Sequence, residues 1–187
     1  MRKLMLFAAC AMLAAMTQAA TVGWSLAGAT AYANDAYQFF IIGQNGATSI
    51  ATVTALLDAG TSVDSYAFGS GSVAANGSAT VSASASGKTL DAGTYTGFFV
   101  VYDSASPASG SANYVVVSGA ANLTKTIAAT TANASFSAGN ASSTLSNADN
   151  WKSFGPSSGG GEGAPEPTSG LLLLVGAGLL GLRRKRA

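Results

Sequence analysis

The stretch Thr94-Tyr-Thr-Gly-Phe-Phe-Val-Val-Tyr102 decides the fold class of this chain. Aromatic and β-branched residues favour strands, and the unbroken apolar run from Phe98 to Val101 predicts a strand that is buried on both faces. Tyr114-Val-Val-Val117 repeats the pattern after a loop at 104–111 that contains Gly and Pro. We therefore expect two central strands, over 94–102 and 112–118, with one face covered by a second sheet or by a helix.

Further strand signals lie on both sides of this centre. Their ranges are Val22–Leu26, Ala36–Ile42, Tyr66–Ala75, Ser78–Ser86, Leu123–Ala129 and Ala132–Ser137. Asn76-Gly77 is a strong hairpin signal, so we expect the two strands that flank it to pair with each other. Asn45-Gly46 is a second turn signal, and it follows a first expected strand pair over 22–26 and 36–42.

One segment has helical spacing. Ser49 is a good N-cap residue, and Gly60 favours a left-handed stop. Apolar residues between them recur on one helical face, at Ile50, Val53, Leu56 and Leu57. We therefore expect a helix over Ser49–Ala59. The predicted fold class is mainly β: a single antiparallel β-sandwich-like domain with one short helix, over residues 21–150.

Composition limits the classes of function. The chain has 187 residues, of which 9% are charged, and it contains no histidine. Histidine is the usual general base and the commonest metal ligand, so most familiar hydrolase sites are excluded. The single cysteine, Cys10, lies in an amino-terminal segment that we expect to be removed, so disulfides should not stabilise the domain.

Charge is distributed unevenly along the chain. Within residues 21–164, seven acidic residues minus three lysines leave a net charge of −4, from Asp35, Asp58, Asp64, Asp91, Asp103, Asp149 and Glu162 against Lys88, Lys125 and Lys152. The other basic residues lie at the two ends. Because the body lacks a basic surface, we expect no nucleic-acid partner.

The amino-terminal end has the layout of a secretion signal, at 1–20. Arg2 and Lys3 are followed by an apolar stretch over 4–16 and then by small residues over 17–20. As a helix this stretch would be about 20 Å long, which is short of the ~30 Å hydrocarbon core. We therefore expect cleavage by signal peptidase rather than retention as an anchor.

The carboxyl-terminal end has three parts in a fixed order. First, residues 151–164 are rich in Gly and Ser, which is typical of a flexible linker. Pro165-Glu166-Pro167 follows, and its prolines lack backbone donors and keep the tripeptide extended. A Leu- and Gly-rich segment then predicts a membrane helix over 169–182, and four cations follow it, at Arg183, Arg184, Lys185 and Arg186. Cations resist translocation and stay cytoplasmic, which orients the body outside.

This tail resembles the PEP-CTERM sorting domain, which is processed by exosortase. The resemblance covers residues 165–187. It implies that Pro165–Pro167 is the recognition element, that the helix is a temporary anchor in the inner membrane, and that the protein is destined for the cell surface or an extracellular polysaccharide matrix. A helix from Thr168 to Leu182 spans only about 22 Å, and so short an anchor suits a segment that is cut off.

The body offers few candidate functional residues. Asp58 and Asp64 flank Gly60, and a carboxylate pair can serve in catalysis or calcium binding. They lack the alternating spacing of a calcium loop, and solvating a loop is the more ordinary role. The tyrosines could stack on sugar rings if several lay on one exposed face, although core packing is the more ordinary role. They are Tyr32, Tyr37, Tyr66, Tyr95, Tyr102 and Tyr114.

We therefore expect an exported, non-enzymatic protein with a structural or interaction role and with no metal or cofactor. The expected partners are signal peptidase, an exosortase-like enzyme, the membrane during transit, and extracellular polysaccharide. The main alternative is a carbohydrate-binding or adhesive module that uses exposed tyrosines. An enzyme that uses Asp58 and Asp64 is a further alternative.

Overall fold

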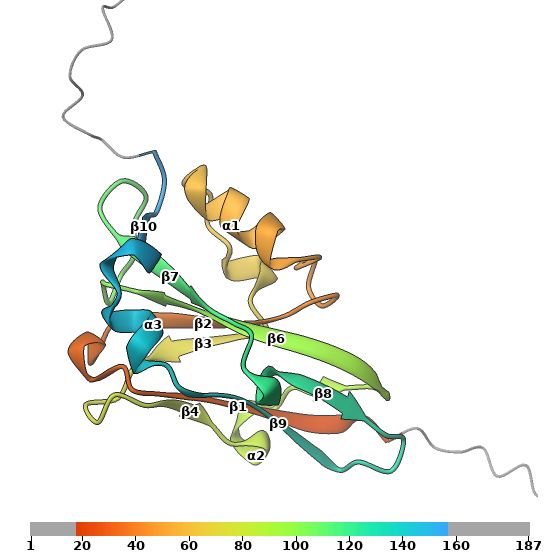
Figure 1. Cartoon of the computed structure of the whole chain (residues 1–187). Helices are drawn as coiled ribbons and strands as arrows, with labels where there is room; N and C mark the ends of the chain where they lie inside the picture. The colour runs from red at the N-terminus through yellow and green to blue at the C-terminus, as the bar shows by residue number, and fades with distance from the viewer. Residues whose placement is uncertain (1–17, 157–187) are drawn as a thin grey trace, which may run out of the picture. The chain divides into compact units, whose positions relative to one another are not determined.

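Ten strands and three α-helices make up residues 18–156, the part of the chain that the computed structural model describes (Figure 1). Four short 3₁₀ helices join them. The order is β1 (Ala20–Ala27), η1 (Thr30–Tyr32), β2 (Ala36–Ile41), α1 (Ile50–Asp58), η2 (Asp64–Tyr66), β3 (Gly69–Ser72), β4 (Ala79–Val81), α2 (Ala83–Ser86), β5 (Thr89–Leu90), β6 (Gly93–Tyr102), β7 (Asn113–Val117), η3 (Ala121–Leu123), β8 (Thr124–Ile127), β9 (Asn133–Asn140), α3 (Ser142–Ser146), η4 (Ala148–Asn150) and β10 (Lys152–Ser153).

β6 is the central strand of a six-stranded sheet, sheet B, in which all pairs are antiparallel. β2 lies along one side of β6 and carries β3 at its far edge. β7 and β8 share the other side, and β10 extends beyond β7. The run from Phe98 to Val101 is fully buried, so the expected burial of this strand on both faces is confirmed.

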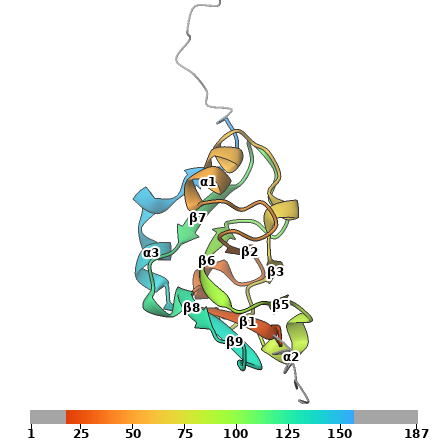
Figure 2. The ribbon, with the colours of Figure 1, turned by 90° about the vertical axis from the view of Figure 1, so that its right-hand side faces the viewer.

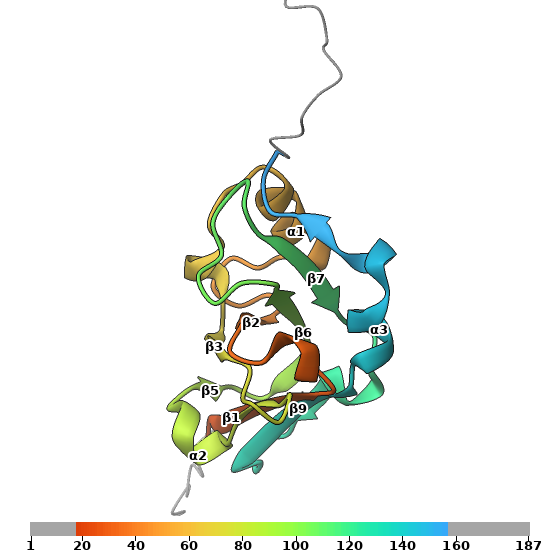
Figure 3. The same ribbon diagram turned by 90° about the vertical axis from the view of Figure 1, so that its left-hand side faces the viewer.

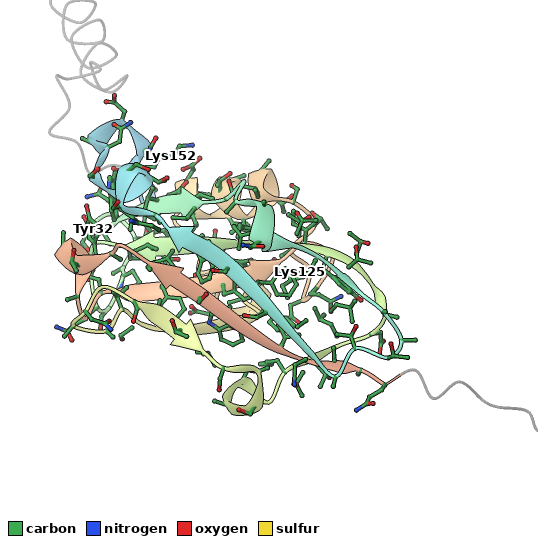
Figure 4. All side chains as sticks on the ribbon, turned by 60° about the horizontal axis from the view of Figure 1, so that its bottom comes forward. Tyr32, Lys125 and Lys152 are labelled. Atoms are coloured by element: carbon green, nitrogen blue, oxygen red, sulfur yellow. The ribbon has the colours of Figure 1, made fainter. Side chains whose placement is uncertain are left out.

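β1 organises the second sheet, sheet A. β4 and β5 pair with one side of β1 in the antiparallel sense, and β9 runs parallel along the other side (Figure 4). On the outer face Ser25 Oγ donates a hydrogen bond to Ser137 Oγ at 2.9 Å, between residues 112 positions apart. The fold is therefore mainly β with two largely antiparallel sheets, and the β1–β9 pair is the exception.

An aromatic core fills the space between the sheets. The ring centroid of Phe39, on β2, lies 5.3 Å from that of Trp24, 4.9 Å from that of Phe99 and 5.6 Å from that of Phe136. Trp24 and Phe136 come from sheet A, so Phe39 contacts side chains of both layers. A Cβ atom at Gly97 would lie 2.7 Å from the Phe39 ring, which explains a glycine in the middle of β6.

α1 covers the outer face of sheet B and forms a third layer (Figures 2 and 3). The Ser49 side chain accepts a hydrogen bond from the backbone N–H of Thr52 at 3.1 Å, and Gly60 follows the helix with φ +73°. Val53 and Leu57 are buried against the sheet. The predicted helix and both of its end signals are confirmed.

The strand pairing around Asn76-Gly77 differs from the prediction. The turn itself forms, with the Ala74 N–H donating to the Ser78 carbonyl at 2.7 Å. However, β3 pairs with β2 and β4 pairs with β1, so the turn carries the chain from one sheet to the other. Val73 follows β3 in sheet B and Ala79 begins β4 in sheet A, and both are buried in the core between the two sheets. β1 and β2, expected as a pair, also lie in different sheets.

The helices and domain limits also differ from the prediction. α2 lies within the range 78–86 that was expected to be a strand, and α3 was not expected. At the amino end, β1 begins at the fully buried Ala20, which pairs with Leu90. At the other end, Lys152–Ser153 forms β10 and Phe154 is buried, inside the range 151–164 expected to be a linker. The folded domain is therefore longer than 21–150 at both ends.

Candidate functional site

Most of the residues that the sequence assigns to sorting lie outside the described range 18–156. These are the signal segment up to residue 17, the tripeptide Pro165, Glu166 and Pro167, the expected membrane helix at 169–182, and the cations Arg183, Arg184, Lys185 and Arg186. Within residues 18–156, none of the helices has the length and apolar character needed to cross a membrane. What the structure does show is how the chain is held immediately before the tail.

The last residues of the domain are fixed by hydrogen bonds to two other segments, the β6–β7 connection and the end of α1. The Phe154 N–H donates to the Ala112 carbonyl at 2.8 Å, and the Phe154 carbonyl accepts from the Gly110 N–H at 2.6 Å. The Gly155 N–H donates to the Leu57 carbonyl at 2.7 Å, at the end of α1. We term residues 152–155 and these partners the C-terminal clamp.

Two glycines face each other in the C-terminal clamp. Gly60 has φ +73° and Gly155 has φ +89°, both in the left-handed region that other residues rarely adopt. A Cβ on Gly60 would lie 3.2 Å from the Gly155 Cα, and a Cβ on either glycine would lie 2.2 Å from Ser109 Oγ. The chain therefore leaves the domain at a point where only glycine fits.

Sequence reasoning assigned this segment to the linker. The available signal was the pair Trp151 and Phe154, two aromatic residues at the start of an otherwise Gly- and Ser-rich stretch. Trp151 packs on Tyr32, with ring centroids 4.6 Å apart, and its Nε1 donates to the Leu145 carbonyl at 2.8 Å. Figure 4 shows Lys152, on β10, in this part of the domain.

Asp58 and Asp64 each serve a different buried neighbour and do not act as a pair. Asp58 accepts a hydrogen bond from the Tyr114 hydroxyl at 2.6 Å. Asp64 accepts from Gln38 Nε2 at 2.5 Å, and Gln38 Oε1 in turn accepts from the Tyr102 hydroxyl at 2.7 Å. Each carboxylate therefore accepts a hydrogen bond from a buried side chain beneath the third layer, which differs from the loop-solvating role considered for these residues.

The two tyrosines in these interactions are held in the neutral form. Burial, with a smaller contribution from the negative charge of Asp64, raises the pKa of Tyr102 above its usual range. Burial and then the hydrogen bond to Asp58 raise the pKa of Tyr114 in the same direction. Both hydroxyls therefore remain donors at any physiological pH.

The tyrosines do not form an exposed platform. Tyr37, Tyr102 and Tyr114 are at most 3% exposed, and the other three are half-buried, at Tyr32, Tyr66 and Tyr95. Core packing, the ordinary role considered for these residues, is therefore the observed one. The described range contains all six tyrosines and exposes none of them fully, so a sugar-binding face would have to use the half-buried Tyr32, Tyr66 or Tyr95.

Asp35 gives a prediction for the dependence of stability on pH. Burial, and then the negative charge of Asp103, raises the pKa of Asp35 above its usual range. The folded state therefore favours the neutral carboxyl group. The stabilisation that this preference gives is fully present below about pH 3.9, the unfolded pKa, and is lost as the pH rises through the folded pKa. We expect Asp35→Asn to raise the melting temperature at pH 7 and to have no such effect near pH 3.

Thermal unfolding of this variant at the two pH values tests the effect. Asp91→Asn provides the control, because Asp91 is an exposed aspartate in the turn between β5 and β6. An equal gain from both substitutions at pH 7 would indicate a change in net charge rather than the local environment of Asp35.

A cleft of about 430 Å³ lies at the side of the sandwich, next to β3. Its residues come from both sheets and their connections, and the defining ones are Trp24, Asp64, Phe68, Ser70, Ser86 and Lys88. Trp24 and Phe68 are nearly buried, so the interior is aromatic, whereas Asp64 and Lys88 provide one charge of each sign. We term this the edge cleft.

A groove of about 490 Å³ lies beside α1. It is lined by residues from α1, β7, η4 and β10, among them Ile50, Thr54, Tyr114, Val116, Asn150 and Lys152.

Over residues 18–156, no group of three or more His, Cys, Asp or Glu side chains is placed to hold a metal ion. Lys125 and Lys152 are well separated in Figure 4, so these two lysines do not form one basic surface.

Comparison with known proteins identifies no relative. No protein family, no curated protein and no solved structure matches this chain.

Proposed function

We propose that this chain is an exported protein of the cell surface or extracellular matrix that is processed at a PEP-CTERM-like tail. The order of the tail carries the proposal: Pro165-Glu166-Pro167, an apolar segment over 169–182 and four cations at 183–186 are adjacent and arranged for membrane arrest. An enzyme of the exosortase type would cut at the tripeptide after signal peptidase has removed the amino-terminal segment.

The end of the folded domain supports this proposal. The C-terminal clamp completes the fold by Gly155. Nine residues, 156–164, separate the clamp from Pro165. At up to ~3.3–3.6 Å per residue they reach roughly 30 Å. A membrane-bound enzyme could therefore reach the tripeptide while the domain stays folded, and the cut would leave the domain intact.

The domain itself fits a structural or interaction role. Its outer strand positions carry mostly Ser, Thr, Asn and Gly, and cross-strand hydroxyl pairs such as Thr94–Thr126, 3.0 Å apart, recur on its surface. The carboxylates that could have formed a catalytic pair instead bond to Tyr114 and Gln38. Extracellular polysaccharide is a candidate partner, although three of the six tyrosines, Tyr37, Tyr102 and Tyr114, are buried in the core.

The proposal is tested by following the full-length chain in a bacterial host that contains an exosortase. We expect the wild-type chain to appear outside the cell without its tail. Pro165→Ala combined with Pro167→Ala should leave an uncut product in the membrane fraction, because the extended recognition element is lost. Replacing Arg183, Arg184, Lys185 and Arg186 by Ser should also prevent normal processing, because it removes the cytoplasmic stop.

Two controls separate sorting from general effects on export. Arg183→Lys with Arg184→Lys and Arg186→Lys keeps the positive charge and should be processed normally. A host without exosortase should accumulate the uncut wild-type chain. If the wild type and both disrupted tails were cut and released alike, the tail would not be the sorting signal.

A further inference from the structure

β3 forms an open edge of sheet B. Its sequence is Gly69-Ser-Gly-Ser72, and all of it except the half-buried Gly69 is exposed. β2 is its partner in the sheet, and Figures 2 and 3 place β3 on the side of the sandwich opposite α3. The edge cleft adjoins it through Gly69 and Ser70.

The free backbone groups of β3 can be assigned from its register. In an antiparallel pair, alternate residues direct their N–H and C=O groups toward the partner strand. The Val73 N–H donates to the Asp35 carbonyl at 2.9 Å, and Tyr37 is opposite Gly71. The odd-numbered residues therefore bond to β2, and the N–H and C=O groups of Ser70 and Ser72 point away from the sheet. Within residues 18–156 these outward groups have no hydrogen-bond partner.

β3 lacks the features that usually protect an exposed edge. Natural edge strands carry lysines, prolines or bulges that prevent pairing with another chain, whereas β3 has only glycine and serine. β9, the edge strand at the other side of sheet A, differs because η3 and β8 lie close beside it. Of these two edges, β3 is therefore the more open to pairing.

We propose that the β3 edge pairs with the β3 edge of a second copy of this chain. If the two strands run antiparallel about a two-fold axis at Gly71, Ser70 of each copy lies opposite Ser72 of the other. Both residues direct their free groups outward, so this register forms four backbone hydrogen bonds and leaves none of those groups unpaired.

The surroundings of β3 favour a second copy over an unrelated extended peptide. Recognition of a foreign strand depends on pockets for its alternate side chains, and beside β3 the edge cleft could supply one, next to Gly69 and Ser70. Pairing of two copies needs no such pocket, because each strand presents only Gly and Ser and the register between them is self-complementary. Each copy also presents Asp64 and Lys88 in its edge cleft, so the facing surfaces carry balanced charge. So small a contact predicts weak association in solution that strengthens where copies are concentrated at a surface.

Cysteine cross-linking tests the register directly. Ser70→Cys and Ser72→Cys are made in separately tagged full-length chains that also carry Cys10→Ser, which removes the chain's single native cysteine. In the proposed register the 70–72 Cα atoms lie about 5.5 Å apart, within disulfide range, whereas the 70–70 atoms lie about 8–9 Å apart, outside it. After mild oxidation of cells producing both variants, we expect roughly fivefold more cross-linked dimer than from either variant alone.

Two further variants make every outcome informative. Ser135→Cys on β9 should give only background cross-linking. Ser70→Pro, which removes an outward N–H that has no partner within the domain, should leave the melting temperature nearly unchanged and abolish dimer capture by an amine-reactive cross-linker. Equal cross-linking by the mixed and single cysteine variants, a mixed yield at the Ser135→Cys level, or full dimer capture with Ser70→Pro would each overturn the proposal. Pairing involves only the domain, so it should occur in uncut chains as well, and failure of tail processing would leave this result unaffected.

Discussion

A chain that ends at Asn150 is expected to lose a large part of its folding stability, whereas a chain that ends at Ser157 keeps all of it. The shorter chain lacks Trp151, β10 and the buried Phe154. Burying a phenylalanine contributes about 1.5–3 kcal/mol, and each backbone hydrogen bond contributes about 0.5–1.5 kcal/mol net. The expected loss is about 3–6 kcal/mol, a large part of the 5–15 kcal/mol that is typical of a domain.

Urea unfolding of the two truncated chains and the mature form measures this difference. Phe154→Ala in the longer chain is the matched variant and should show an intermediate loss, because the backbone hydrogen bonds of β10 remain. If the chain ending at Asn150 were as stable as the longer one, the C-terminal clamp would not be part of the fold. The linker would then begin at 151.

Replacing Phe39 by alanine should cost about 3–5 kcal/mol of unfolding free energy. The ring is fully buried and contacts Trp24, Phe99 and Phe136, so its removal leaves a cavity at the centre of the sandwich. Gly97, which faces this ring at close range, cannot move in to fill the space because it has no side chain.

Chemical denaturation of Phe39→Ala and Phe39→Leu tests this account of the core. Leucine keeps much of the volume and should cost clearly less than alanine. A loss below about 1 kcal/mol for alanine would mean that the two sheets do not depend on this ring for their packing.

Local signals in the sequence predicted the elements well. The apolar run of β6 indicated burial on both faces because alternate residues of a strand point to opposite sides, so four successive apolar residues need two covers. Those covers are sheet A and α1. Ser49 and Gly60 marked the ends of α1 because capping and left-handed stops depend on neighbouring residues alone.

The choice of strand partners could not be predicted in the same way. Asn76-Gly77 reverses the chain, but a turn signal does not state which strands pair, and here the core between the sheets takes Val73 and Ala79 from opposite sides. The parallel pairing of β1 with β9 joins residues 112 positions apart. No local pattern encodes so distant a partner.

The polar interactions beneath α1 could not be predicted from the sequence either. Gln38 is an ordinary polar residue in the sequence, and its place between Asp64 and Tyr102 depends on β2, β6 and η2 coming together.

The tail is the opposite case, because its signals are short and consecutive and can be recognised without knowledge of the fold. The part of the account that concerns sorting therefore depends on the sequence, and the part that concerns the domain depends on the structure.

The intact mass of the extracellular form tests the central claim most directly. The account predicts a chain that begins near Ala20, where β1 starts, and ends at or near Pro165–Pro167, so that it retains the whole C-terminal clamp and lacks the apolar segment and the four cations. A mass that includes residues 169–187 would contradict it.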